Sequence, residues 1–294
     1  MWRPGVFGGR VIGHPPTMSR ETTTETTLEV QGATVPKLGL GTWPITGSDC
    51  VVAVRDALEL GYDHIDTARA YGNEAQVGQG LHDSGRNRGE IFLTTKLWYT
   101  ELSAIGVHDQ VERSLRALRT EYIDLLLIHW PNRRVPVAET LAAMLDARDA
   151  GRVRHLGVAN FPSAMLREAL EHAPLVCNQI EYHPYLAQPQ VLEVVRDHGL
   201  MATAYSPLAQ GAVLHDPTLG EIAQAHDRTA AQVALRWLLD QPQVAAVPKA
   251  SSREHRTANL DVVDFELTDE ERGRIAGLHR GYRTIDPPWA PDWD

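Results

Sequence analysis

The 294-residue sequence predicts an α/β fold, a single (β/α)8 TIM barrel, and three observations support this prediction. Eight short apolar runs rich in β-branched residues alternate with segments whose apolar residues recur every three or four positions. The alternation covers residues 28–294, close to the roughly 250 residues that such barrels typically need. No Ser- or Pro-rich linker divides this stretch. We therefore expect one domain over residues 28–294, with parallel strands inside and helices outside.

The eight apolar runs are the expected strands of the barrel. They span Val35–Trp43, His64–Ala68, Ile91–Leu97, Ile123–Trp130, Val153–Asn160, Val176–Tyr182, Leu200–Ser206 and Val244–Lys249. Between them, residues 48–61, 106–119 and 229–240 show the helical apolar pattern clearly. Gly61 ends the first of these patterns, which is typical of a glycine that follows a helix C-terminus.

A short hairpin and a tail come before the barrel. Residues 27–37 read TLEV, QGA and TVPK, and we expect this hairpin to plug the bottom of the barrel. Residues 1–27 have neither helical nor alternating periodicity, so they are expected to be a disordered tail. The tail also lacks the continuous apolar region of a secretory signal. Met18, within it, offers a second position at which translation could start.

An open, doubly wound sheet is the alternative fold. Its dinucleotide site requires a glycine-rich turn after the first strand. The nearest segment, GLGTWP at residues 39–44, lacks the third required glycine. The barrel is therefore favoured.

Composition and charge exclude several classes of function. The chain has 38 acidic and 28 basic residues, a net charge of −10, and no basic stripe that would attract a phosphate backbone, so we expect no nucleic-acid partner. No apolar run reaches the about 18 residues of a membrane helix, so we expect no membrane association. The two cysteines are too few for a disulfide framework and suit a reducing compartment. We therefore expect a cytoplasmic protein.

Ionisable and amide side chains end nearly every expected strand, where barrels carry their functional residues. They are Asp66, Lys96, His129, Asn160, Gln179, Glu181, Ser206 and Lys249. Each could simply be a polar residue at a point where the chain emerges into solvent. That interpretation does not explain why Asp66, Lys96 and His129 end neighbouring strands, beneath three tryptophans that the sequence places at the same rim. These tryptophans are Trp43, Trp98 and Trp130, each of which could instead belong to the core.

Other catalytic chemistries lack their motifs. No HxH or HExxH pattern suggests a metal site, and Glu181 with His183 is better explained by packing or backbone positioning. The GxSxG turn of serine hydrolases and the GxxxxGK[ST] loop of nucleotide hydrolases are absent. Cys50 has no evident histidine partner, and a core position is the simpler interpretation. We therefore expect no metal.

Lys96 leaves two possibilities open. A buried lysine at a strand end can form a Schiff base with a carbonyl substrate, as in aldolases. A charged lysine paired with Asp66 would instead lower the pKa of a neighbouring acid. Tyr71, five residues after Asp66, is the candidate acid, although it could also pack at a loop-to-helix junction.

The chain resembles the aldo-keto reductases over residues 28–294. The matching segments, in the order and spacing of that family, are GLGTW, HIDTARAYGNE, TTKLW, DLLLIHWP, GVANF, NQIEYHP, AYSPL and VPKASS, with Asn259 behind the last. Within the family, the APDWD ending is similar to that of the bacterial 2,5-diketo-D-gluconate reductases of the shorter type.

The resemblance implies a (β/α)8 barrel that reduces aldehydes and ketones to alcohols with NAD(P)H, usually as a monomer. It implies a catalytic tetrad of Asp66, Tyr71, Lys96 and His129. Tyr71 would protonate the carbonyl oxygen, Lys96 paired with Asp66 would lower the pKa of Tyr71, and His129 would orient the carbonyl. The implied substrates are small dicarbonyls or keto-sugars, such as methylglyoxal or 2,5-diketo-gluconate.

The resemblance also implies an NADPH site, with NADH as the weaker alternative. Its residues would be Asn160, Gln179, Tyr205, Ser206, Pro207, Leu208, Lys249, Ser251, His255 and Asn259, with Trp43, Trp98 and Trp130 around the substrate. Ala159 and Ala250 stand where serine is common in the family, and His255 stands where arginine is common. These departures weaken the expectation of strict NADPH preference. A regulatory or structural barrel without turnover remains the alternative, because some members of the family serve such roles.

Overall fold

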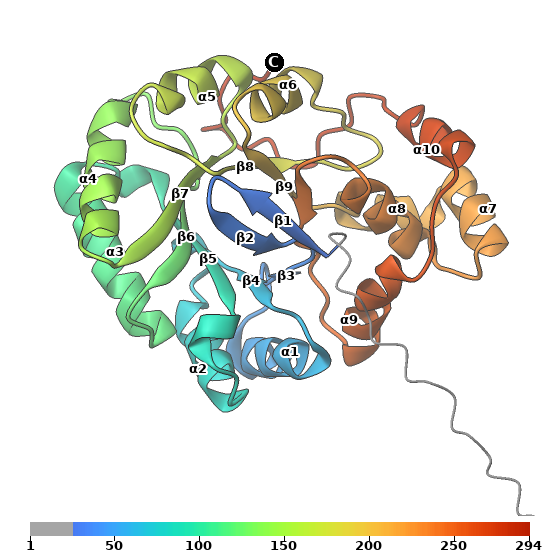
Figure 1. Cartoon of the computed structure of the whole chain (residues 1–294), viewed down its shortest axis with the longest axis horizontal. Coiled ribbons are helices and arrows are strands. Elements are labelled where there is room, and N and C mark those ends of the chain that lie inside the picture. Colours follow the sequence, from blue (N-terminus) through green and yellow to red (C-terminus); the bar gives the residue numbers. More distant parts are fainter. Residues whose placement is uncertain (1–25) are drawn as a thin grey trace, which may run out of the picture.

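A ring of eight parallel strands forms the centre of the computed structural model, which describes residues 26–294 (Figure 1). The strands pair in the order in which they occur in the chain. They are β3 (Leu40–Gly41), β4 (His64–Asp66), β5 (Phe92–Leu97), β6 (Ile123–Ile128), β7 (Val153–Ala159), β8 (Cys177–Glu181), β9 (Met201–Tyr205) and β10 (Val244–Ala246). The predicted (β/α)8 barrel and its eight strands are confirmed.

The ring closes between its first and last strands. Leu38 pairs in parallel with Ala246, and the amide of Gly41 donates to the carbonyl of Pro248 at 3.1 Å. A Cβ atom on Gly41 would lie 2.5 Å from the carbonyl oxygen of Val247, so only glycine permits this close approach. Strand β3 is shorter than predicted because Val35, the start of the predicted run, belongs to the preceding hairpin.

Ten α-helices among the described residues surround the ring (Figure 1). They are α1 (Gly47–Leu60), α2 (Glu74–Asp83), α3 (Ala104–Leu118), α4 (Val137–Asp149), α5 (Ser163–Leu170), α6 (Pro189–Asp197), α7 (Pro217–Ala225), α8 (Ala230–Leu239), α9 (Arg253–Leu260) and α10 (Asp269–Ala276). Gly61 ends α1 in the left-handed conformation with φ of 105°, as its position in the sequence predicts. None of these helices is long and apolar enough to cross a membrane.

The predicted hairpin covers one end of the ring. Strands β1 (Thr27–Val30) and β2 (Ala33–Pro36) pair antiparallel, and Figure 1 shows them across the centre of the ring. Val30 and Val35 pack with Phe92 and Leu125 of the strands in one apolar cluster. The hairpin therefore plugs the barrel, as expected. Of the predicted disordered tail, residues 1–27, all but the last two residues lie outside the described residues. Those two belong to the hairpin, because Thr27 begins β1 and the carbonyl of Thr26 accepts from the amide of Lys37 at 2.9 Å, so the predicted boundary of the tail is wrong by two residues.

Candidate active site

Four polar side chains meet at the carboxyl ends of neighbouring strands. Asp66 ends β4, Lys96 lies near the end of β5, and His129 follows β6. Tyr71 is contributed by a short 3-10 helix, Arg69–Tyr71, that follows β4. Because β4, β5 and β6 are adjacent in the ring, their parallel pairing brings together residues that are far apart in the sequence. The structure thus groups all four residues that the sequence analysis expects to form the tetrad.

Lys96 is buried at the centre of this group. Its Nζ donates to Asp66 Oδ1 at 2.6 Å, to the carbonyl of Thr67 at 2.8 Å and to Tyr71 Oη at 3.4 Å. A lysine ammonium has three donors, so all of them have partners within the protein. Burial lowers the pKa of Lys96, and the charge of Asp66 opposes that lowering. The carboxylate of Asp66 is held in turn by Gln179, whose Nε2 donates to Oδ2 at 2.7 Å.

The pKa of Tyr71 differs from the one that the sequence predicts. Burial raises the pKa of its phenol well above the usual value, and the charge of Asp66 raises it further. The sequence predicts that Lys96 lowers this pKa, but a sequence does not show how far the phenol is buried. The phenol therefore holds its proton in the free protein. Lys96 donates to the phenol oxygen and so holds its ammonium group beside it.

His129 lies between Tyr71 and the tryptophans. Its ring centroid is 5.6 Å from that of Tyr71 and 5.4 Å from that of Trp98, in edge contacts. Burial lowers the pKa of His129 well below its usual value, and the Lys96 charge adds to this effect. The imidazole is therefore neutral at neutral pH, and a neutral imidazole carries one hydrogen-bond donor and one acceptor.

The expected amides are buried beside the tetrad. Asn160 Nδ2 donates to the carbonyl of His129 at 2.9 Å, and its Oδ1 accepts from Tyr205 Oη at 2.6 Å. Gln179 is held by Asp66. Asn160 has a φ of 64°, a left-handed conformation uncommon outside glycine, and it fixes the point at which the chain turns after β7. These contacts fix the positions of both amides at the base of a cavity.

A cavity of about 710 Å³ opens above these residues. It is lined by three members of the tetrad, by Asn160 and Gln179, by the loop after β9 and by the tryptophans. The lining includes Asp66, Tyr71, His129, Asn160, Gln179, Tyr205, Ser206, Pro207, Leu208, Lys249, His255, Trp43, Trp98 and Trp130. Lys96 does not line the cavity, because it lies behind Tyr71.

Two expected cofactor residues lie outside the cavity. Ser251 is exposed and does not contribute to the lining. Asn259 is buried beside the Tyr62 hydroxyl rather than in the cavity. Lys249 and His255 do line it, and both side chains are exposed there.

The C-terminal segment contributes lining residues that the sequence analysis missed. Ile285, Pro287 and Trp289 line the cavity, and the Trp289 ring lies 6.0 Å from that of Trp98. The signal in the sequence was the APDWD ending, which does not say which side chains of the segment reach the cavity.

Glu181, at the end of β8, fastens this segment. Its carboxylate accepts from the amide of Thr284 at 2.7 Å, from the amide of Ile285 at 3.0 Å and from His183 Nε2 at 3.0 Å. Burial would raise the pKa of Glu181, but the hydrogen bonds from His183 and Thr284 outweigh it and the pKa is lowered. Glu181 and His183 thus have the positioning role that the sequence analysis favoured over metal binding. Within residues 26–294, no group of three or more His, Cys, Asp or Glu side chains is arranged to hold a metal ion.

The cavity has features that suit a large polar cofactor. Two buried polar atoms, Thr42 Oγ1 and His129 Nδ1, have no hydrogen-bond partner among the described residues. The chain after β9 passes through left-handed conformations at Ser206, Ala209 and Gln210, which fold this loop back over the cavity. The exposed side chains of Lys249 and His255 form no ion pair with any described residue, which leaves Lys249 available to an anionic group.

Comparisons with known proteins identify the family of the chain. The family model described as "Aldo/keto reductase family" matches residues 37–280. The chain is 38% identical over 269 residues to methylglyoxal reductase DkgB of Salmonella typhi, covering 89% of this chain and 100% of the relative. An aldo-keto reductase of Mycolicibacterium smegmatis is 40% identical over 263 residues, covering 87% and 94%.

Solved structures give the same result. A protein provisionally named 2,5-diketo-D-gluconic acid reductase B is 42% identical, with a TM-score of 0.90 over 92% of this chain and 97% of that one. The Gox0644 structure is 37% identical, with a TM-score of 0.84 over 89% and 97%. The family match covers most of the chain and all four residues expected in the tetrad. The chain therefore belongs to the aldo/keto reductase family of carbonyl-reducing oxidoreductases.

Proposed function

We propose that the protein reduces aldehydes and ketones to alcohols with NADPH, and that Tyr71 is the proton donor. The observation that carries this proposal is the contact between Tyr71 and Lys96. Lys96 donates to Tyr71 Oη, so that oxygen is free to direct its own proton into the cavity that Tyr71 lines. A half-buried phenol of raised pKa keeps its proton until an acceptor arrives.

The neighbouring residues complete this role. NADPH, when bound, supplies the hydride that the carbonyl carbon accepts. As the carbonyl oxygen gains charge, Tyr71 gives up its proton, and the ammonium of Lys96 stabilises the phenolate. Asp66 keeps Lys96 charged despite its burial. Neutral His129, beside Tyr71, orients the carbonyl by a hydrogen bond.

The cofactor would lie along the side of the cavity formed by Tyr205 and the loop that follows it. Asn160 and Gln179 would contact the carboxamide of the nicotinamide, and Tyr205 would pack on its ring. Lys249 would bind the 2′-phosphate that distinguishes NADPH from NADH, with His255 beside it. Ser251 and Asn259 are proposed only as more distant contacts, since neither lines the cavity.

Small dicarbonyl compounds are the proposed substrates, because the similar proteins include enzymes named methylglyoxal reductase and 2,5-diketo-D-gluconic acid reductase. Trp43, Trp98 and Trp130 would surround them. We propose a cytoplasmic monomer, in line with the acidic composition and the scarcity of cysteine.

The aldolase alternative is not supported by the position of Lys96. Its three donors have protein partners, and it lies behind Tyr71 rather than in the cavity lining. A Schiff base requires a lysine nitrogen that a substrate carbonyl can reach.

The test is direct. The purified protein is mixed with NADPH and methylglyoxal, and the absorbance of the reduced nicotinamide is followed. We expect a loss of absorbance that depends on methylglyoxal and yields one alcohol for each NADPH consumed. A protein that binds NADPH but turns over neither methylglyoxal nor a panel of simple aldehydes would instead be a binding or regulatory barrel.

A further inference from the structure

A buried ion pair joins α9 to α1. Arg256 of α9 is 3% exposed and Asp56 of α1 is 6% exposed, although both side chains are ionisable. The Nε of Arg256 lies 2.7 Å from Asp56 Oδ2, and its Nη2 lies 2.6 Å from the same oxygen. The other carboxylate oxygen accepts from Arg253, which begins α9. Because a buried charge is costly without its partner, this pairing restricts how α9 can sit on α1.

The same guanidinium also holds the segment that leads into α9. Arg256 Nη1 donates to the carbonyl of Ala250 at 2.9 Å. Ala250 lies between Lys249 and Ser251, in the stretch that joins β10 to α9. The hydroxyl of Tyr62, which follows α1, donates to the carbonyl of Arg256 at 3.0 Å and holds its backbone as well. One side chain therefore connects α1, α9 and the segment that carries Lys249.

Little else holds this segment in place. The stretch between β10 and α9 has no regular structure. At its start the carbonyl of Pro248 accepts from an amide of β3, and at its end Ser252 caps α9. Between these two points, within the described part of the chain, the bond from Arg256 is the only hydrogen bond to the backbone of residues 249–251. The backbone that carries Lys249 is therefore fixed by Arg256.

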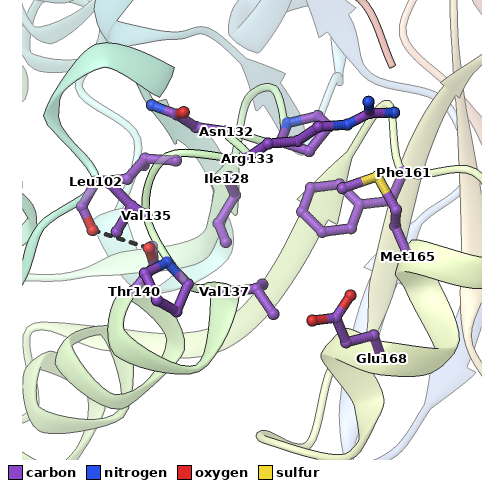
Figure 2. Close-up of a pocket in the computed structure, with 12 residues that line it drawn as sticks. Leu102, Ile128, Asn132, Arg133, Val135, Val137, Thr140, Phe161, Met165 and Glu168 are labelled. Carbon is purple, nitrogen blue, oxygen red and sulfur yellow. Dashed lines mark hydrogen bonds between the residues drawn. The ribbon is translucent and has the colours of Figure 1, made fainter. Parts of the chain in front are cut away.

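Arg256 is placed to act through other residues rather than on a ligand. It is buried and does not line the large cavity, whereas Lys249 is exposed and does. Arg133 provides a contrast, because it lines a separate cavity of about 240 Å³ between α4 and α5 (Figure 2). Its side chain is 68% exposed and pairs with Asp292 at the surface, where water can replace either partner. The buried contacts of Arg256 have no such replacement.

We propose that Arg256 is a positioning residue through which the protein distinguishes NADPH from NADH. By joining the carbonyl of Ala250 to the Asp56 pair, it keeps Lys249 directed toward the 2′-phosphate that NADH lacks. This inference rests on the proposed function, in which Lys249 binds that phosphate. The lysine side chain is long and flexible, so a fixed backbone reduces the conformational entropy that is lost when it binds.

Cofactor affinities test the inference. Fluorescence titration gives the Kd for NADPH and the Kd for NADH, and their ratio measures how strongly the phosphate is recognised. We expect Arg256→Met to raise the Kd for NADPH by about fivefold or more and the Kd for NADH by less than about twofold, because only NADPH carries the 2′-phosphate. Arg256→Lys should act in the same direction, since an ammonium lacks the fork that reaches Asp56 and Ala250 together. Equal changes in the two Kd values would overturn the inference.

A matched variant separates this role from a loss of stability. Arg236 of α8 is also buried, pairs with Asp240 at 2.6 Å and donates to the carbonyl of Val263 at 3.4 Å, but it does not line the cavity. Arg236→Met should lower the Tm, as Arg256→Met does, and leave the ratio of the two Kd values unchanged. A similar change of the ratio in both variants would show that the ratio follows stability, and the inference would fail.

A double variant tests whether Arg256 acts through Lys249. In a chain that already carries Lys249→Met, adding Arg256→Met should raise the Kd for NADPH by less than about twofold, because the phosphate contact is already lost. A further rise as large as in the parent would overturn the inference. If Arg256→Met does not fold, Asp56→Leu is combined with it. That pair replaces both buried charges by apolar side chains and still removes the bond to Ala250.

Failure of the inference and failure of the proposed function give different results. If the parent binds NADPH more tightly than NADH and Arg256→Met leaves that preference intact, the protein is an NADPH enzyme and the inference is wrong. If the parent binds both cofactors equally, Lys249 does not recognise the phosphate, and the inference again fails while carbonyl reduction stands. If the parent binds neither cofactor, the proposed function fails, and the inference fails with it.

Discussion

At the scale of single residues, burial controls the protonation of the tetrad: it raises the pKa of Tyr71 and lowers the pKa of His129. The strand-end positions of Asp66, Lys96 and His129 predict a cluster because parallel strands end at one edge. The direction in which the pKa of Tyr71 shifts could not be predicted in this way. Burial raises this pKa, and its effect is larger than the lowering that the sequence suggests for the charge of Lys96. The contact of Asn259 with Tyr62 could not be predicted for a related reason, since it depends on packing that no local pattern shows.

The pH dependence of reduction follows from these pKa directions. Tyr71 keeps its proton through neutral pH because its pKa is raised above the usual value of about 10, and His129 stays neutral because its pKa is lowered. We expect kcat for methylglyoxal, at saturating NADPH, to vary by less than about threefold between about pH 6 and pH 8. A steep fall toward pH 8 would indicate that the pKa of Tyr71 lies in the neutral range, contrary to this account.

Cofactor preference is a second prediction at this scale. Lys249 carries a charge toward the proposed phosphate position, whereas the imidazole of His255 is charged only when protonated. Lys249→Met should lower NADPH affinity by about tenfold or more, because a charged hydrogen bond contributes roughly 1.5 to 3 kcal/mol. His255→Arg should raise NADPH affinity at pH 8. NADH affinity, measured by the same fluorescence titration, is the control and should change little in both variants. If the affinities for NADPH and NADH change equally, neither residue contacts the 2′-phosphate.

At the scale of elements, the alternation of apolar runs predicted every strand of the ring, and the hairpin pattern predicted β1 and β2. The segment after α10 escaped prediction because it has no regular structure and is held by distant residues. Asp294 accepts from the amide of Ser163 at 2.8 Å, a contact across 131 positions of the sequence. Glu181 holds the same segment from β8. Long-range contacts of this kind leave no periodic signal.

The attachment of this segment to β8 can be tested with Glu181→Gln. The substitution removes a charge that accepts from Thr284 and Ile285, so we expect the free energy of unfolding to fall by about 1.5 to 3 kcal/mol. The KM for carbonyl substrates should rise, because Trp289 would be held less firmly, while the Kd for NADPH should stay the same. Chemical denaturation and steady-state kinetics measure these effects. The matched control is Glu121→Gln, which alters an exposed carboxylate distant in sequence from Glu181. It should leave the free energy of unfolding, the KM and the Kd unchanged. Unchanged stability and KM in Glu181→Gln would show that the segment is held by its other contacts.

At the scale of the whole molecule, residues 26–294 form a closed ring with its hairpin plug, and the cavity opens at the carboxyl ends of the strands. The chain's length and alternation were enough to predict this architecture, because few folds accommodate eight such units. The shape of the cavity was not predictable in the same way, since loops and the C-terminal segment form much of its lining.

The extent of the folding unit is a prediction at this scale. We propose that residues 28–294 are sufficient, because residues 1–27 have no pattern that could bury an apolar face. A chain beginning at Met18 should match the full chain in Tm and in turnover of methylglyoxal. A lower Tm or a slower turnover of the shortened chain would show that the first 17 residues contribute to the fold.

The central claim, that Tyr71 protonates the carbonyl, is tested most directly by Tyr71→Phe. The substitution keeps the aromatic ring and removes only the hydroxyl, so it should lower kcat by roughly 10² to 10⁴ through loss of general-acid catalysis. The Kd for NADPH, measured by fluorescence titration, should remain that of the parent. An unchanged Kd would show that the substitution has not disrupted the cavity. We predict this combination of lost turnover and retained binding. Turnover within about threefold of the parent, at saturating NADPH, would contradict the account.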